Sequence, residues 1–91
     1  MSWGSRLVNK FLSRGGVRAG MVGRDMIVYW ENGRKMTIAG EMLSDGVVVY
    51  VASIVAWDDS DGELIGEAER RRITENVKTS FESQGTRVEL C

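Results

Sequence analysis

The chain has 91 residues, which is enough for one domain and too few for two separate hydrophobic cores. Hydrophobic residues make up 43% and charged residues 27% of the sequence, a globular balance that excludes a wholly disordered tail. No run approaches the roughly 20 apolar residues that a membrane-spanning helix requires.

The net charge of −1 hides an uneven distribution of charged residues. Residues 1–24 carry five Arg or Lys and no acid, whereas residues 46–69 carry six Asp or Glu and no base. We therefore expect a basic pole and an acidic pole, which concern the choice of partner rather than the fold. Cys91 is the only cysteine, so no internal disulfide can form, and early charges interrupt any secretory signal. A cytoplasmic location is the expectation.

The first predicted element is an amphipathic helix over residues 2–14, ended by Gly15-Gly16. Its basic side chains lie opposite an apolar stripe at helical spacing. The stripe consists of Trp3, Leu7, Val8, Phe11 and Leu12. Two interpretations stay open, a helix packed on the domain's own sheet or a basic surface for a membrane or nucleic acid. Residues 1–24 are therefore predicted to form a separate basic segment ahead of a domain over residues 25–91.

Residues 17–22 are spaced by glycine and are compatible with either a short strand or a connector. A β-hairpin centred on Asn32-Gly33 follows, because this pair is preferred in two-residue type I′ turns. The turn sets the strand register and places Glu31 opposite Arg34 as a pair of opposite charges. The residues predicted to face the core are Ile27, Tyr29, Met36 and Ile38, with Lys35 and Thr37 pointing away.

A second turn signal, Asp45-Gly46, leads into an apolar strand over residues 47–52. Because every position is apolar, we expect both faces of this strand to be covered. The N-terminal helix is the candidate for the second cover. Residues 53–57 either continue the strand or bend into a turn, and residues 58–62 form a polar, acidic loop.

A second, longer helix is predicted over residues 66–84, capped by Gly66 and ended by Gly85. Its buried stripe is expected to consist of Ala68, Ile73, Val77 and Phe81. A strand over residues 86–90 then completes the domain. The predicted fold is α+β: an antiparallel sheet of about four strands, made of two hairpins and the C-terminal strand, packed by this long helix and accompanied by the N-terminal amphipathic helix.

The sequence carries no recognisable catalytic arrangement, since it has no histidine to activate a nucleophile and no lysine in a known motif. An EF-hand alignment of the acidic loop fails because its first and twelfth positions would be Trp57 and Ala68. The glycines do not form a phosphate-binding pattern. We therefore predict a non-enzyme without a metal or small-molecule cofactor. The thin spread of basic residues also argues against nucleic acid or a membrane as the main partner.

A series of residues between about Met26 and Leu90 carries a family resemblance through its order and spacing. They are Gly33-Arg34, Gly40-Glu41, Val49-Tyr50, Ser53-Ile54, Trp57, Ile73, Asn76 and Gly85. This pattern resembles the immunity protein 74 family, small proteins of bacterial polymorphic toxin systems. The resemblance implies a non-catalytic protein that neutralises a toxin encoded beside it by direct binding. It implies no particular functional residues, and the basic N-terminal segment lies outside it.

The predicted contact surface combines Trp57 with the acids that follow it, and Trp30 is a second aromatic candidate, because Trp is enriched at binding hot spots. The acids are Asp58, Asp59, Asp61 and Glu63. Ordinary packing of Trp57 in the core is the competing interpretation, and the favoured one. The predicted partner is a cognate protein toxin, whose association the acidic charge would speed. An adaptor acting through residues 1–24, a structural subunit and a homo-oligomer stay open as alternatives.

Overall fold

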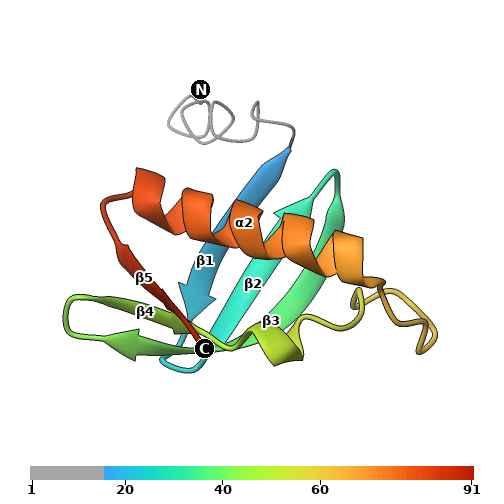
Figure 1. Cartoon of the computed structure of the whole chain (residues 1–91), viewed down its shortest axis with the longest axis horizontal. Coiled ribbons are helices and arrows are strands. Elements are labelled where there is room, and N and C mark those ends of the chain that lie inside the picture. The colour runs from blue at the N-terminus through green and yellow to red at the C-terminus, as the bar shows by residue number, and fades with distance from the viewer. Residues whose placement is uncertain (1–15) are drawn as a thin grey trace.

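The computed structural model describes residues 16–91, which form one curled sheet crossed by one long helix (Figure 1). The order along the chain is strands, a short 3₁₀ turn, the long helix and a last strand. The elements are β1 (Val17–Val22), β2 (Met26–Glu31), β3 (Arg34–Leu43), β4 (Gly46–Val49), η1 (Val51–Ser53), α2 (Glu67–Ser83) and β5 (Arg87–Leu90). The predicted helix over residues 2–14 lies outside the described residues.

The sheet has five strands in the order β1-β2-β3-β4-β5. The first four pair antiparallel, whereas β5 pairs parallel to β4. The prediction of about four strands, all antiparallel, is therefore wrong on both counts. The reason for the parallel pair is that the chain crosses from β4 to β5 through α2, and such a crossover returns the strand in its original direction. Residues 17–22, for which two interpretations were open, form strand β1.

The hairpin of β2 and β3 has the predicted turn and register. Asn32 and Gly33 both have positive φ, 52° and 85°, as a type I′ turn requires. Tyr29 pairs with Met36 and Ile27 with Ile38, and all four side chains are fully buried. Lys35 and Thr37 are exposed. The prediction for this hairpin is confirmed.

Gly40 is placed where β3 passes from pairing with β2 to pairing with β4. A Cβ atom here would overlap the side chain of Ile27 and lie 2.8 Å from the carbonyl oxygen of Val48. Close approach of neighbouring strands therefore requires glycine at this position. One long strand, β3, can therefore pair with β2 through its first half and with β4 through its second half.

Helix α2 covers one face of the sheet, and the hydrophobic core lies between them. Gly66 precedes it as the N-cap residue, and Gly85 follows it with a φ of 83°. Ile73, Val77 and Phe81 are buried as predicted, but Ala68 is exposed. Five residues separate Ala68 from Ile73, which turns their side chains roughly 140° apart on a helix. The buried stripe instead includes Thr74.

Strand β4 is shorter than the apolar run over residues 47–52, because the chain turns into η1 after Tyr50. Its three valines, residues 47–49, are all buried, as an entirely apolar strand predicts. Ser53 stabilises the bend: its hydroxyl donates to the carbonyl of Tyr50 and accepts from the amide of Ala39. Among residues 16–91, no helix is both long enough and apolar enough to cross a membrane.

Candidate functional site: the acidic loop and its anchors

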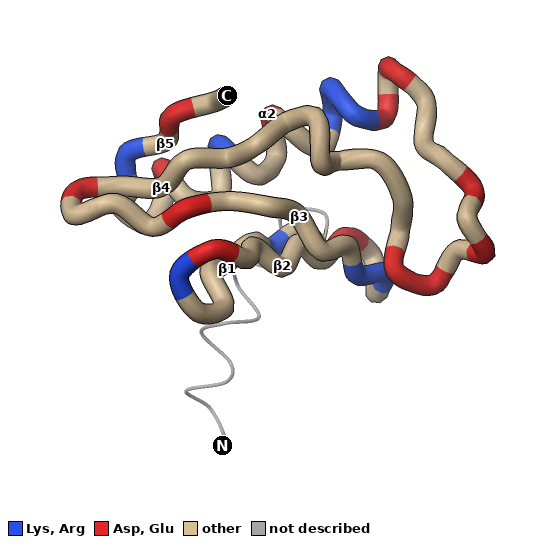
Figure 2. The backbone as a smooth tube through the Cα atoms, turned by 90° about the horizontal axis from the view of Figure 1, so that it is seen from below, with Lys and Arg blue, Asp and Glu red and all other residues tan. Residues whose placement is uncertain are grey.

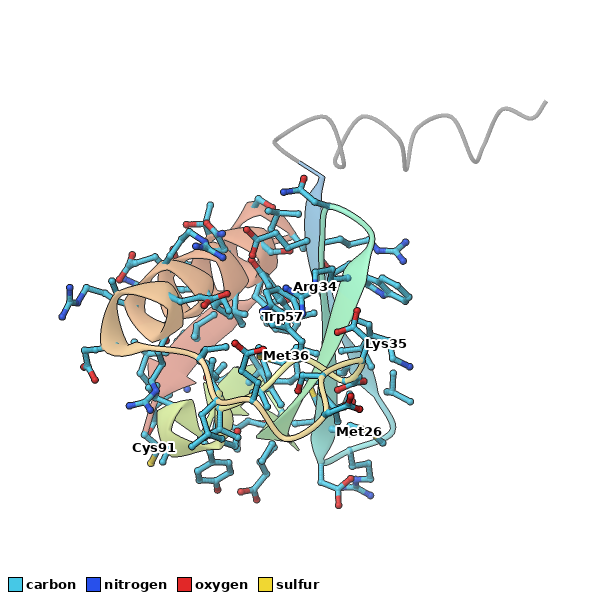
Figure 3. The ribbon with its side chains drawn as sticks, turned by 90° about the vertical axis from the view of Figure 1, so that its right-hand side faces the viewer. Met26, Arg34, Lys35, Met36, Trp57 and Cys91 are labelled. Atoms are coloured by element: carbon cyan, nitrogen blue, oxygen red, sulfur yellow. The ribbon has the colours of Figure 1, made fainter. Side chains whose placement is uncertain are left out.

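The structure separates the predicted contact residues into two places. Trp57 and the acids after it belong to the connection between η1 and α2. Trp30 lies on β2, where alternation directs its side chain to the opposite face from buried Tyr29. Figure 3 shows Trp57 and Met36 between the sheet and the helix, with Lys35 pointing to the other side. The two tryptophans therefore do not form one surface.

Trp57 is a core residue and holds the start of the acidic loop in place. Only 6% of it is exposed, and its ring centroid lies 6.1 Å from that of Tyr29. Its indole Nε1 donates a 3.0 Å hydrogen bond to Glu69 on α2. The guanidinium of Arg34 lies 4.6 Å from the ring centroid, a cation–π arrangement that closes the remaining side. The interpretation of Trp57 as ordinary packing accounts for these contacts.

Asp58 extends the sheet by pairing with the free edge of β3. Its amide donates to the carbonyl of Lys35, and its carboxylate accepts from the amide and hydroxyl of Thr37 at 3.0 and 2.9 Å. Lys35 Nζ also lies 3.9 Å from this carboxylate. Strand β4 pairs with β3 only from Gly40 onward. Asp58 therefore satisfies edge groups that no strand covers.

Asp59 pairs with Arg34 through a 3.0 Å ion pair. The hydrogen bond from Arg34 holds the pKa of the Asp59 carboxyl below its ordinary value of 3.8. This arrangement corrects the prediction that Glu31 and Arg34 form a pair of opposite charges. The two residues are opposite each other in the strand register, but each side chain forms its ion pair elsewhere. Glu31 binds Arg72 on α2 at 3.0 Å instead, because its side chain points towards the helix.

The outer half of the connection between η1 and α2 carries exposed side chains. Asp61 and Glu63 are exposed, and in the described part of the chain their carboxylates have no hydrogen bond or ion pair. Leu64, between Glu63 and Ile65, is 72% exposed. We call residues 58–66 the acidic loop; it projects from the end of the sheet, with acidic positions along its length (Figure 2). Sequence reasoning missed Leu64, although an apolar residue beside acids in a polar loop is a readable signal.

Both ends of the acidic loop are held to the body. Asp58 and Asp59 hold the first end to the hairpin, and the amide of Ile65 donates to the carbonyl of Val55 at 2.8 Å near the second. The hydroxyl of Ser60 donates to the carbonyl of Trp57 at 2.9 Å and tightens the turn between them. The loop is therefore a positioned surface feature rather than a loose tether.

A polar network ties the hairpin to the helix beneath this loop. The hydroxyl of Tyr29 donates to Glu31 at 2.9 Å and accepts from the amide of Asn76 at 3.0 Å. Burial is the largest cause that raises the pKa of Tyr29 well above its ordinary value. Arg72 joins Glu31 to Glu69, the acceptor of the Trp57 indole. Movement of the loop base would break several of these bonds together.

The hollows at this end suit a side chain better than a small molecule. A recess of about 100 Å³ lies at the base of the acidic loop, below the size of typical ligand pockets. It is lined by Arg34, Trp57, Ser60, Glu63, Leu64, Ile65 and Glu69. In residues 16–91 no group of three or more His, Cys, Asp or Glu side chains is arranged to hold a metal ion.

The family model for immunity protein 74 matches residues 21–90, more than three quarters of the chain. The chain belongs to the immunity protein 74 family. All the predicted contact residues lie inside the match, whereas residues 1–20 lie outside it. Membership of the immunity protein 74 family indicates a toxin-neutralising role. No curated protein and no solved structure matches the chain.

Proposed function

We propose that this chain neutralises a cognate bacterial toxin by direct, non-catalytic binding, and that the acidic loop makes the central contact. The observation that carries the proposal is the family match over residues 21–90. The partner is a protein encoded beside this one, and the surface it presents is basic with an apolar recess. This chemistry complements the loop.

The acidic loop is favoured as the contact because its outer half combines free charge with one apolar side chain. Within residues 16–91 the carboxylates of Asp61 and Glu63 have no partner to lose on binding, so they are available to cations on the toxin. Leu64 gains the most from burial, since 72% of it is exposed. An apolar centre with a polar rim is the usual arrangement of a protein–protein interface.

The anchored ends of the loop favour tight binding. Residues that are already held in place lose less conformational entropy on association than a free loop would. Trp57, Asp58 and Asp59 serve this purpose in our proposal: they position the loop and do not themselves need to touch the toxin. Their contacts with Arg34, Thr37 and Glu69 are made within this chain.

The test begins by purifying this chain with the product of the adjacent gene and measuring whether it inhibits that protein's activity. Association is then followed for the double variant Asp61→Lys/Glu63→Lys. The matched control is Glu75→Lys/Glu82→Lys, which changes the net charge equally at exposed positions of α2. Loop reversal should lower the association rate roughly tenfold at low salt, and less at high salt, because oppositely charged surfaces steer encounter.

The variant Leu64→Asp should raise the rate at which the complex dissociates, because it places a charge where the toxin would bury an apolar side chain. Its melting temperature should stay near that of the parent, since Leu64 is exposed. If the loop and control variants lower the association rate equally, the loop contributes only through net charge and is not the contact surface. Absence of inhibition by the intact chain would overturn the function itself.

A further inference from the structure

The face of β1, β2 and β3 that points away from α2 is apolar and uncovered within residues 16–91; we call it the outer face. Cross-strand pairing arranges it in three rows. The rows are Arg18–Trp30–Lys35, Gly20–Val28–Thr37 and Val22–Met26–Ala39. Val22 is 50% and Met26 37% exposed. A sheet face of this kind normally packs against another element, because exposed apolar patches favour association.

The outer face contains a groove over β1. A hollow of about 460 Å³ lies there, with Trp30 and Val28 on one side and Val22 at one end. Its floor is Gly20, where an added Cβ would meet no atom within 4 Å. A groove with a side chain missing from its floor accepts a large apolar side chain from whatever lies on it.

We propose that the outer face is the docking site of residues 2–14 of this same chain. The segment joins the sheet at the right place, because Gly16 precedes β1, the edge strand of this face. Gly16 has a φ of 71°, the left-handed conformation in which helices commonly end, and its carbonyl accepts from the amide of Asn32. The segment therefore approaches from the hairpin-turn end of the groove.

Length and pattern both fit this occupant. Thirteen helical residues span roughly 20 Å, and six residues of β-strand span about the same. A helix antiparallel to β1 would cover the groove from one end to the other. Its apolar stripe, which includes Leu7 and Phe11, would face Gly20 and Val28. The polar residues opposite the stripe, which include Asn9 and Ser13, would stay in water.

Charge argues against a second copy of the chain as the occupant. Arg18 and Lys35 flank Trp30 in the first row of the outer face: Arg18 pairs with Trp30 across β1 and β2, and Lys35 pairs with it across β2 and β3. Two such faces packed together would bring like charges into one interface, which is costly. At 100° per residue Arg6 and Lys10 lie on the flank of the apolar stripe and only Arg14 falls within it, so residues 2–14 bring one cation to this face where a second copy would bring two. This proposal differs from the expectation that the helix covers the strand over residues 47–52, of which Val47 and Val49 belong to the core beneath α2.

The test uses the full chain with Trp3→Phe as the background, so that only Trp30 and buried Trp57 fluoresce. Adding Leu7→Glu/Phe11→Glu should expose Trp30 to acrylamide quenching and lower the melting temperature by roughly 10 °C. The matched control, Asn9→Glu/Ser13→Glu, adds the same charge on the opposite side of the helix and should leave the quenching of Trp30 unchanged.

A second variant tests whether the greater quenching of Trp30 and the lower melting temperature come from lost docking or from general loss of folding. Val28→Glu alters the outer face from the other side, and combining it with Leu7→Glu/Phe11→Glu should lower the melting temperature by less than the sum of the two effects. Additive effects, or a Trp30 that is equally quenched in every variant, would overturn the proposal. So would protection of Trp30 that appears only in a dimer seen by sedimentation, or only on anionic phosphatidylglycerol vesicles.

Discussion

Trp30 lies on β2 and Trp57 in the connection between η1 and α2, and the surroundings of the two rings differ. Trp57 is enclosed by Tyr29, by the Arg34 guanidinium and by a hydrogen bond to Glu69. Trp30 faces the other way, where the Lys35 ammonium lies 5.9 Å from its ring centroid. Trp57 packs beside Tyr29, and strand alternation turns Trp30, the next residue of β2, to the other face of the sheet. The face under α2 became the core, and the other remains available for a covering element.

The largest effect is expected when the enclosed tryptophan is removed. Trp57→Ala should lower the free energy of unfolding by about 3–5 kcal/mol, because it deletes a buried ring and removes the indole hydrogen bond to Glu69. Trp30→Ala should cost less, about 1–2 kcal/mol, since its ring is only half-buried. Urea denaturation of both variants measures the difference. Equal losses would mean that the outer face is as much a core as the inner one.

A glycine on each face sharpens the same comparison. Gly40→Ala should destabilise by about 1–3 kcal/mol, because its Cβ would overlap Ile27 and crowd the carbonyl of Val48. Gly20→Ala should cost less, about 1 kcal/mol, because its Cβ meets no atom of residues 16–91 but would crowd a side chain of residues 2–14 docked on the floor of the groove. Thermal unfolding of the two variants decides. A neutral or stabilising Gly20→Ala would show that nothing fills the groove down to its floor.

The smallest effect separates the two halves of the acidic loop. Asp58→Ala should cost about 1 kcal/mol, because the amide and hydroxyl of Thr37 lose their acceptor. Asp61→Ala should leave the melting temperature unchanged, since its carboxylate is free in the described structure. Hydrogen exchange at the Thr37 amide should speed up in the first variant alone. Equal exchange in both would contradict the assignment of Asp58 as an anchor.

Much of the fold was predictable because its signals act over a few residues. Asn32-Gly33 specifies a tight turn, and alternation from that turn decides which side chains of β2 and β3 are buried. Gly66 and Gly85 bound α2 for the same local reason. The candidate site was found as a stretch of chain, since acids and a tryptophan are visible in sequence. Its division into anchors, Asp58 and Asp59, and exposed acids, Asp61 and Glu63, could not be predicted from the sequence.

The sequence by itself determined the hairpin, the helix and the family to which the chain belongs. Only the tertiary structure decided that β5 runs parallel to β4, that β1 joins the sheet, and that Arg34 pairs with Asp59 rather than with Glu31. Turn chemistry and periodicity are properties of adjacent residues, so they can be read along the chain. Strand direction and ion-pair partners depend on which distant segments α2 brings together when it packs on the sheet, and no local pattern encodes that choice.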